Sequence, residues 1–383
     1  MHVIANRSQL LENLVIVERA VPSRTTMPVI NGILLEATAE NMSFSATNVD
    51  IGIKSSNSVM EVLQEGQVVL PVKFVDILRQ LSDEKVEIKS DPENFRTELN
   101  SGKSNFVLYG MATEEFPSFT PEEEWKKWTH LNFLANEFKK IFRKVIFAVS
   151  NDESKPSFRG ILLEMDEQGL ITCLASDTYR LACLQQQMPV EQGEINAFRL
   201  LVPGKSLNEL LRIIEDSPED KVSGYFKDNE IIFVYRQFTF YLRLLEDRYP
   251  NLMNVFPGNH QTRVTVSASN LERTISRALL LAQGYNNMIS LIINDGVLKV
   301  KAGSDMGRME EELELDGKKG ENLEEILINA RFFLDPLRIL DKEFIDLEFN
   351  GYLGPCIFNT GSLESSSHYR YLILPIKVDK QEE

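Results

Sequence analysis

The sequence contains little cysteine, tryptophan and histidine, with three, two and four of these residues among 383. Three cysteines cannot all form disulfides, and Cys173, Cys183 and Cys356 have no Cys-x-x-Cys spacing. We therefore expect buried thiols in a reducing compartment. No apolar run approaches the roughly 20 residues that a membrane span needs. The N-terminus lacks the basic-then-apolar pattern of a signal peptide, so the expected location is cytoplasmic.

The residue patterns of catalytic and metal sites are also missing. His2, His130, His260 and His368 are scattered, without the His/Cys spacing of zinc sites. No Gly-x-Ser-x-Gly nucleophile motif occurs. The acidic run at 310–312, like the one at 122–124, could hold Mg²⁺, but such runs usually form solvated surface. The sequence therefore predicts no catalytic residue, no bound metal and no cofactor.

The letters Gly-Lys-Ser that end a phosphate-binding loop occur at 102–104 and at 204–206. That loop also needs a glycine five residues before the Gly-Lys-Ser glycine, so that backbone N–H groups can surround the phosphates. Thr97 and Arg199 occupy those places. We predict a hairpin turn or a helix start at each Gly-Lys-Ser instead of a nucleotide site.

The pentapeptide GILLE occurs twice, at 32–36 and at 160–164, and its surroundings recur with it. Each copy follows an amphipathic segment and precedes alternating, strand-like residues, a second helix and further strands. A fainter third copy follows, in which Ile289 takes the place of Gly32 and Gly160, and Asn329 that of Pro71 and Pro203. The segments at 118–131 and at 250–263, the second with two prolines, look like domain boundaries. The sequence predicts a threefold internal repeat.

Positive charge is scarce in the chain as a whole, since 41 Lys and Arg stand against 57 Asp and Glu, which argues against a nucleic-acid partner. The expected helices differ, because together they carry net positive charge. Their windows are 6–21, 72–81, 135–149, 204–214, 267–282 and 329–340.

Basic residues recur about two helical turns apart in the second helix of each repeat, so each pair lies on roughly one helix face. For any one pair an ordinary solvated helix face is the better interpretation. Their recurrence favours a shared basic surface that holds a polyanion by its phosphates. The pairs are Lys73 and Arg79, Lys205 and Arg212, and Arg331 and Arg338.

Several segments together resemble the β sliding clamp family, the processivity subunits of bacterial replicative DNA polymerases. They are VPSRTTMPVINGILLEA after the first helix, EEFPSF, DESKPSFRGILLE, ASDTYRLA, RYPNL and the terminal YLILPIKV. The resemblance extends over the chain to about Val378. It implies an α+β fold of three repeated DNA-clamp domains at residues 1–122, 130–253 and 258–378, followed by a tail at 379–383.

The resemblance further implies that two chains join head to tail into a six-domain ring with inner helices and outer sheets. Such a homodimer would encircle duplex DNA without reading its sequence. It would tether the replicative DNA polymerase as a processivity factor, dock the clamp loader and repair proteins through short peptide motifs, and have no enzymatic activity and no membrane partner. The weak contacts of Lys and Arg within about a Debye length of the duplex would let the ring slide.

A hydrophobic pocket for partner peptides is expected between the second and third domains, as an apolar cup with a few polar groups at its lip. Leu353 and Pro355 match the family less well. The family usually has Gly-His where Thr178 and Tyr179 stand and often a basic residue at Asn254, which puts the partner preference in question. The matching positions are Phe158, Ser176, Thr178, Tyr179, Arg180, Leu181, Pro250, Asn254, Val255, Asn329, Phe332, Leu372, Ile373, Leu374, Pro375, Ile376 and Lys377.

Two further surfaces are expected. Arg24 and Lys155, with Pro156 and Ser157, match loop positions that touch DNA in the family, and basic residues of the helices complete the DNA-facing set. That set is Arg24, Lys73, Arg79, Lys139, Lys140, Arg143, Lys144, Lys155, Lys205, Arg212, Arg273, Arg277, Arg331 and Arg338. At the dimer interface, edge-strand residues of one chain would meet an acidic strand and a helix of the other. These residues are Lys103, Phe106 and Leu108, and Leu280, Leu281, Glu310 and Glu311.

Two alternatives stay open. The chain could be a divergent clamp paralogue that acts in repair or in mobile-element replication, with altered partners. It could also be an acidic cytoplasmic hydrolase with an unrecognised carboxylate site. A stable dimer would favour a ring, and metal-dependent activity would favour the hydrolase.

Overall fold

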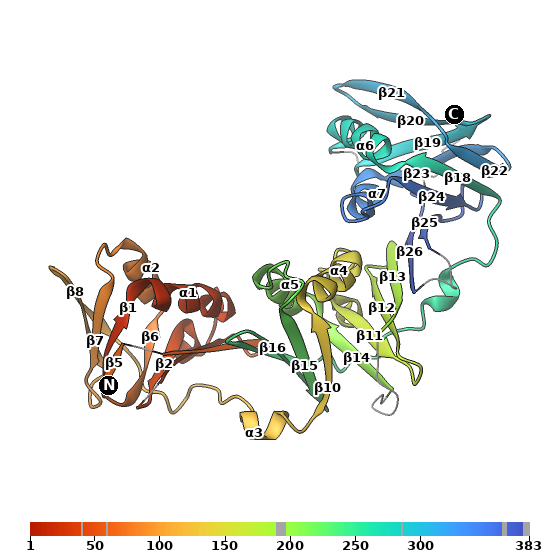
Figure 1. Cartoon of the computed structure of the whole chain (residues 1–383). Coiled ribbons are helices and arrows are strands. Elements are labelled where there is room, and N and C mark those ends of the chain that lie inside the picture. The colour runs from red at the N-terminus through yellow and green to blue at the C-terminus, as the bar shows by residue number, and fades with distance from the viewer. Residues whose placement is uncertain (40, 59, 189–196, 285, 362–365, 378–383) are drawn as a thin grey trace. The chain divides into compact units, whose positions relative to one another are not determined.

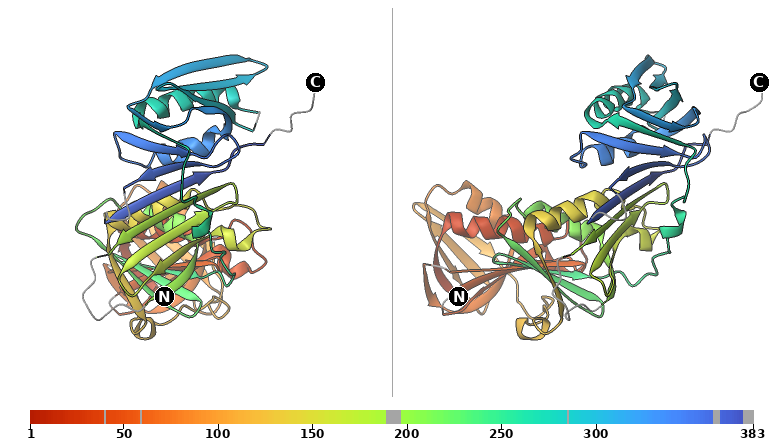
Figure 2. Two further views of the ribbon diagram at one scale, coloured as in Figure 1. Left: turned by 90° about the vertical axis from the view of Figure 1, so that its right-hand side faces the viewer. Right: turned by 45° about the vertical axis from the view of Figure 1, so that its right-hand side comes forward.

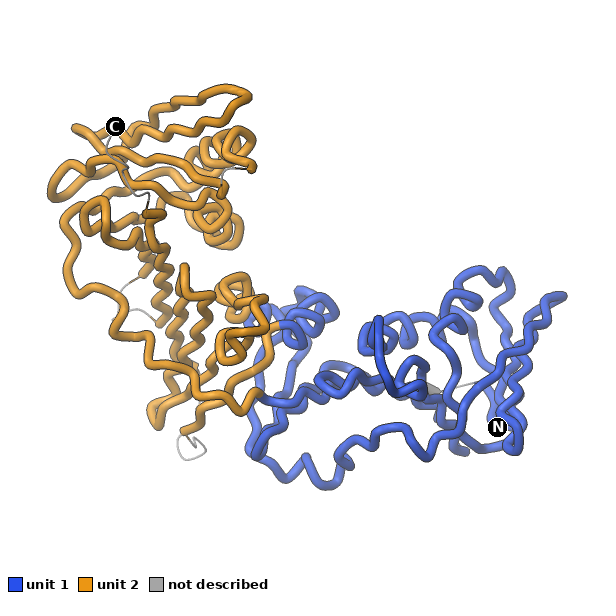
Figure 3. The backbone as a smooth tube through the Cα atoms, turned by 180° about the vertical axis from the view of Figure 1, so that it is seen from behind, with its two compact units in different colours: residues 1–139, 205–244 blue, residues 140–204, 245–383 orange. Residues whose placement is uncertain are grey.

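The structure is a computed structural model that describes all residues except 40, 59, 189–196, 285, 362–365 and 378–383. Its contacts divide the chain into two compact units (Figure 3). Unit 1 comprises residues 1–139 and 205–244, and unit 2 comprises residues 140–204 and 245–383. The expected second domain contributes strands to both units. The tail expected at 379–383 lies outside the described residues.

Unit 1 contains two antiparallel sheets (Figure 1). The five-stranded sheet has the order β5 (Glu61–Gln64), β1 (His2–Asn6), β7 (Lys85–Ser90), β8 (Arg96–Ser101) and β9 (Ser104–Tyr109). The eight-stranded sheet has the order β10 (Thr129–Leu134), β15 (Lys221–Lys227), β16 (Glu230–Tyr235), β17 (Phe238–Arg243), β4 (Ile51–Ser58), β3 (Asn41–Thr47), β2 (Gly32–Ala37) and β6 (Gly66–Pro71).

Unit 2 also contains two antiparallel sheets, and Figure 2 shows the chain from two further sides. The nine-stranded sheet has the order β14 (Phe198–Pro203), β11 (Gly160–Met165), β12 (Leu170–Ser176), β13 (Arg180–Gln187), β26 (Ser367–Ile373), β25 (Cys356–Thr360), β24 (Phe344–Phe349), β18 (Thr262–Ser267) and β22 (Gly317–Gly320). The four-stranded sheet has the order β21 (Gly307–Glu314), β20 (Val297–Ser304), β19 (Met288–Asn294) and β23 (Leu323–Asn329).

All six expected helices are present, and each lies close to its predicted window. They are α1 (Arg7–Val17), α2 (Lys73–Gln80), α4 (Ala135–Ile146), α5 (Gly204–Ile213), α6 (Ala268–Ala282) and α7 (Ala330–Leu337). The expected boundary at 118–131 also holds a short helix, α3 (Glu122–Trp125), which the sequence did not predict. Single 3-10 turns occur at Glu18–Ala20, Pro28–Asn31, Pro156–Arg159 and Met253–Val255.

The helices cover the sheets with apolar faces that recur every three or four residues. In α1, Leu10, Leu14 and Val17 are buried on one such face. Asn13 lies on the same face, and its amide donates to the Gln9 carbonyl at 2.8 Å, so this buried polar group has a partner. In unit 2, α6 and α7 pack against each other and against the four-stranded sheet.

The threefold repeat is visible in the order of the elements. The second repeat runs β10, α4, β11 to β13 and then β14, α5, β15 to β17, and the third runs β18, α6, β19 to β21 and then β23, α7, β24 to β26. Pro71 pairs with Gly32, and Pro203 pairs with Gly160.

One register prediction in the third repeat was wrong. Asn329 pairs with Met288, so Met288 rather than Ile289 corresponds to Gly32 and Gly160. The third copy has no glycine to mark the position, and only the pairing with β23 fixes the register.

Both Gly-Lys-Ser sequences have the predicted local structure. Gly102 has a φ of +55° in the turn between β8 and β9, a conformation that favours glycine. Gly204 is the first residue of α5. The predictions of a hairpin turn and a helix start are therefore confirmed.

Candidate partner pocket, basic helices and edge strands

The expected partner pocket centres on the antiparallel pairing of β13 with β26, within unit 2. Leu181 lies opposite Leu372, and both side chains are almost fully buried, at 3% and 2% exposed. They belong to an apolar cluster against which the half-buried Phe158 packs. Leu181 and Leu372 thus form the floor of this region and offer little of their own surface to a partner.

Several of the expected pocket residues have exposed apolar side chains. Tyr179, Val255 and Leu374 are 60%, 47% and 43% exposed, and Leu353, which matched the family less well, is 60% exposed. Pro250 is half-buried, and Asn254 is exposed beside Val255. A partner that covered these groups would remove apolar surface from water, which is favourable.

Arg180 joins three elements of unit 2. Its Nε donates to Asp177 at 2.8 Å and its Nη2 to the Phe147 carbonyl at 2.7 Å, and its Nη1 contacts the Asp335 carboxylate on α7. The guanidinium also lies over the ring of Phe332, 4.3 Å from the centroid. Burial acts to lower the pKa of Arg180, but Tyr371 and the Asp177 carboxylate together favour the charged guanidinium, so the pKa is raised overall.

The segment after β26 lies beside both β13 and β23. The Leu374 N–H donates to the Tyr179 carbonyl at 2.9 Å, and the Ile376 N–H donates to the Leu327 carbonyl at 2.7 Å. Pro375 and Ile376 are half-buried, Lys377 is exposed and Ile373 is buried. These backbone hydrogen bonds set the direction in which the Leu374 side chain leaves the strand.

Asn329 forms the N-cap of α7. Its side-chain oxygen accepts from the N–H groups of Arg331 at 2.9 Å and Phe332 at 3.3 Å, which satisfies two donors at the helix start. Its amide donates to the Asn286 carbonyl at 3.0 Å. Asn329 therefore acts on this region by orienting α7 and the Phe332 ring.

Thr178 has a backbone conformation that glycine adopts more readily. Its φ is +82°, in the left-handed region that side chains with a Cβ disfavour. The Ser176 hydroxyl accepts from the Thr178 N–H at 3.1 Å, and Lys155 Nζ donates to the Thr178 hydroxyl at 2.9 Å. Lys155 also lies 5.4 Å from the centroid of the Tyr179 ring. The threonine at position 178, where the family usually has glycine, thus carries backbone strain, which these contacts offset.

The three cysteines are free and buried, as predicted. Burial raises the pKa of Cys183 to about 11, and it raises the pKa of Cys173 and Cys356 as well. These thiols are therefore protonated near neutral pH and are weak nucleophiles and poor metal ligands.

In unit 1, most of the basic residues expected to face DNA are exposed, although several form ion pairs with acidic residues. Lys73 and Arg79 both contact Asp76, at 2.8 and 2.9 Å, and Arg212 contacts Glu209 at 2.8 Å. Lys205 and Arg24 are exposed.

Lys139 departs from this pattern. It is only 7% exposed, because this position of α4 faces inward, so it does not offer the solvated charge that the sequence suggested. The run of basic letters at 139–144 could not reveal which of them the helix turns inward.

In unit 2, Lys140, Arg143, Arg273, Arg331 and Arg338 are exposed. Lys144 is half-buried, and burial, followed by repulsion from Lys342 and Lys140, lowers its pKa. Arg277 donates through Nε to Glu311 at 2.9 Å, and this hydrogen bond is the main reason that the pKa of Glu311 is lowered. One expected DNA-facing residue and one expected interface residue are thus bonded to each other.

The residues expected at a dimer interface lie at two sheet edges. In unit 1, β9 is an edge strand that carries Phe106, 37% exposed, and Leu108, with Lys103 in the preceding turn. In unit 2, β21 is an edge strand that carries Glu310 and Glu311.

The helix residues Leu280 and Leu281 lie near the end of α6, and Leu280 is 66% exposed. Sequence reasoning missed Tyr109 on β9, which is 75% exposed. The expected interface set also leaves out Met309, which lies on β21 next to Glu310. The unbroken apolar run at 106–109 is the signal that could have identified Tyr109.

Among the described residues, we find no group of three or more His, Cys, Asp or Glu side chains that could hold a metal ion. Within the same residues, no helix has both the length and the apolar character to cross a membrane.

Comparisons with known proteins match one family along nearly the whole chain. Family models for the N-terminal, central and C-terminal domains of the DNA polymerase III beta subunit match residues 1–120, 132–251 and 253–377. The beta sliding clamp of Halalkalibacterium halodurans is 33% identical, over 96% of this chain and 98% of that protein.

Solved structures give the same result. The DNA polymerase sliding clamp of Bacillus subtilis superposes with a TM-score of 0.91 at 28% identity, with 99% of each chain covered. A DNA polymerase III beta subunit of Eubacterium rectale has a TM-score of 0.90 at 28% identity, over 99% of this chain and 100% of that chain. With its three repeated clamp domains, this chain belongs to the DNA polymerase III beta subunit family, the beta sliding clamps.

Proposed function

We propose that two copies of this chain close head to tail into a six-domain ring that encircles duplex DNA and tethers a DNA polymerase to it. We place the three domains at residues 1–122, 130–253 and 258–378. The work of such a ring is topological, so it needs no catalytic residue, metal or cofactor, and we propose that the protein is not an enzyme. Its expected place of action is the cytoplasm, where bacterial DNA is replicated.

The observation that carries the proposal is the repeated pairing of strands between successive domains. Within unit 1, the last strand of domain 2, β17, pairs with β4 of domain 1. Within unit 2, the last strand of domain 3, β26, pairs with β13 of domain 2. The equivalent strands β9 of domain 1 and β21 of domain 3 take no part in these two pairings. Both are edge strands in the single chain.

The exposed fraction of one aromatic residue supports the same arrangement. Phe106 lies two residues into β9, as Phe240 lies in β17, and each pairs with the preceding strand in its hairpin. Phe240 is fully buried where β17 meets β4, whereas Phe106 is 37% exposed. An edge strand with an exposed aromatic is a ready site for pairing with another chain.

The corresponding register can be read from the two pairs inside the chain. Phe240 lies opposite Ile53, and Ile53 lies opposite Ala46 of the neighbouring strand. In the third domain, Met309 has the place of Ile53, because it lies opposite Ala302. We therefore propose that Phe106 packs opposite Met309 of the partner subunit.

Two further surfaces complete the proposal. The exposed lysines and arginines of the helices would hold the DNA backbone through non-specific, salt-sensitive contacts. Polymerase and clamp loader would dock at the β13–β26 junction, where Tyr179, Val255 and Leu374 offer exposed apolar surface around a buried floor. Thr178 and Asn254 would adjust which peptides bind.

Topological retention tests the ring. The protein is loaded onto nicked circular DNA, and half of the sample is linearised before gel filtration in moderate salt. A ring should stay with the circle and slide off the linear form, because only the open ends release it. Equal retention on both forms would show binding by contact alone and would contradict the proposal.

A further inference from the structure

The two junctions inside the chain have the same local construction, so residues of one can be matched with residues of the other. In each, a turn leads into the junction strand, and its hydroxyl accepts a backbone N–H two residues on. Thr47 accepts from Val49 at 3.0 Å, and Ser176 accepts from Thr178 at 3.1 Å. Val49 and Thr178 both have φ near +80°.

The strand registers agree as well. Gly52 lies opposite Tyr241 where β4 meets β17, and Leu181 lies opposite Leu372 where β13 meets β26. Since each pair is reached from the same turn, Gly52 and Tyr241 occupy the positions that Leu181 and Leu372 occupy at the second junction. The first junction therefore contains the counterpart of the proposed partner pocket.

That counterpart is filled by the chain's own connector, residues 113–121. Phe119 stacks on Tyr241, with ring centroids 4.5 Å apart and an angle of 23° between the planes. A Cβ on Gly52 would lie 2.1 Å from the Phe119 ring. The glycine at 52 thus leaves room for an aromatic ring at the place where the second junction has a leucine.

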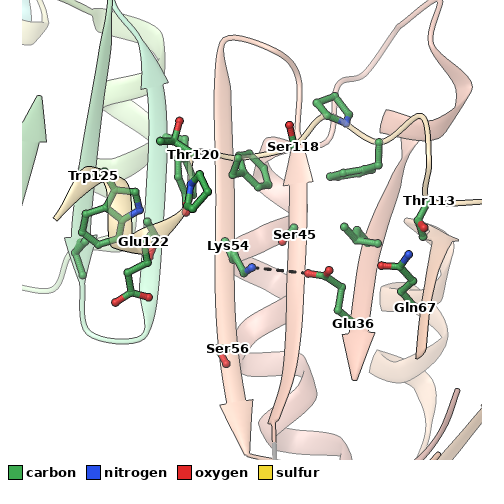
Figure 4. Close-up of a pocket in the computed structure, with 18 of the residues that line it drawn as sticks. Glu36, Ser45, Lys54, Ser56, Gln67, Thr113, Ser118, Thr120, Glu122 and Trp125 are labelled. Carbon is green, nitrogen blue, oxygen red and sulfur yellow. Dashed lines mark ion pairs between the residues drawn. The ribbon is translucent and has the colours of Figure 1, made fainter. Parts of the chain in front are cut away.

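The surface around the ring differs from that of the second junction. Ser45 and Lys54 lie on β3 and β4 at the positions of Leu174 and Cys183, which are buried in the apolar cluster. Lys54 forms an ion pair with Glu36 at 3.7 Å. Figure 4 shows this hollow, with Ser118 and Thr120 on the connector and the Glu36–Lys54 pair on the sheet.

We propose that the first junction is a second peptide groove that the chain keeps closed with its own connector, with Phe119 as the anchoring side chain. An external peptide reaches this groove only when the connector is displaced, so each chain presents one open groove. The inference rests on the proposed function to the extent that the second junction is taken as the partner site.

A double-mutant cycle tests whether the Phe119 side chain packs against Gly52. Gly52→Ala places a methyl group against Phe119 and should displace the ring, whereas with Phe119→Ala the same methyl group meets empty space. Gly52→Ala should therefore lower Tm in the parent chain and leave it nearly unchanged in the Phe119→Ala chain. Equal effects in both backgrounds would overturn the assignment.

Intrinsic fluorescence reports whether the connector moves. The two tryptophans, Trp125 and Trp128, both lie just beyond it, and Trp125 is buried. Gly52→Ala should shift the emission to longer wavelength, as the connector exposes Trp125. An unshifted spectrum alongside a lowered Tm would show that the ring is only a packing residue and would contradict a displaceable connector.

Peptide binding tests the groove itself, with a labelled peptide that copies residues 114–121. The background is Leu374→Asp, which disables the second junction. With Phe119→Ala added, the peptide should bind at least tenfold more tightly than to Leu374→Asp alone. A peptide with Ala at the Phe119 position should show no such gain in affinity.

Equal binding with and without Phe119→Ala would overturn the groove. The proposed function is tested separately: polymerase should be retained by the parent chain but not by Leu374→Asp, and equal retention by both would contradict it. That measurement can fail while the groove result stands, because it depends on the second junction alone.

Discussion

The guanidinium of Arg180 lies 4.3 Å from the centroid of the Phe332 ring and contacts Asp335 one helical turn further along α7. A strand of the second repeat and a helix of the third are thus held together by one side chain. The planar guanidinium can stack on the ring and donate to carboxylates at the same time, which an ammonium group cannot do.

Arg180→Lys should therefore weaken both the fold and partner binding. The substitution keeps the charge but loses the fork of hydrogen bonds to Asp177, Asp335 and the Phe147 carbonyl. Each charged hydrogen bond contributes about 1.5–3 kcal/mol, so Tm should fall by several degrees on thermal denaturation. Arg331→Lys, at an exposed position of the same helix, is the control and should leave Tm unchanged.

Leu374→Asp should weaken binding of a polymerase-tail peptide by roughly tenfold or more. Burying an apolar side chain contributes about 1.5–3 kcal/mol, and each ~1.4 kcal/mol is tenfold in affinity. Titration with a fluorescent peptide measures the loss. Met306→Asp, at an exposed apolar residue on another turn, should bind normally, and a similar loss there would argue against a local pocket.

Phe106→Ala should shift the protein toward monomer at low concentration, because the proposed interface loses its aromatic anchor. Sedimentation across a dilution series gives the dissociation constant. Leu63 lies on β5, at the other edge of the same sheet. The control Leu63→Ala should therefore leave the dissociation constant unchanged. An undisturbed dimer with Phe106→Ala would contradict the assigned interface.

Arg331→Glu should reduce contact with DNA while leaving peptide binding intact. Arg331 is exposed on α7, and a lost phosphate contact lowers the slope of log affinity against log salt by about one. Lys319→Glu makes the same charge change on the exposed strand β22 and should leave the salt slope unaltered. Equal salt slopes for the two variants would contradict the assignment of α7 to the DNA-facing surface.

Stability should depend on the ionisation of Lys144. Burial lowers its pKa in the folded chain, so the folded state disfavours the protonated form that the unfolded chain carries below about pH 10.4. This penalty acts at neutral pH and disappears as the pH rises through the unfolded pKa, so stability rises with pH in that range. Lys144→Met should raise Tm at pH 7, and the gain should shrink toward pH 10.5. A gain independent of pH would contradict the titration of Lys144.

Much of the fold follows from local patterns in the sequence. The amphipathic pattern of 6–21 predicted α1, and the alternation around Gly32 and Gly160 predicted the paired strands, because helix and strand periods depend only on neighbouring residues. The repeat extended these predictions to the third domain, where the one-residue error at Met288 arose because no glycine marks the register.

The sequence by itself determined the threefold repeat, the helix positions and the resemblance to the sliding clamps, since these depend on spacing and on short identical segments. The tertiary structure decided which of these residues are accessible. Lys139 and Leu181 became buried, Arg180 gained its carboxylate on α7, and Phe119 took the place opposite Gly52. Each outcome depends on side chains that are far apart in the chain and meet only when sheets close, so no local pattern contains it.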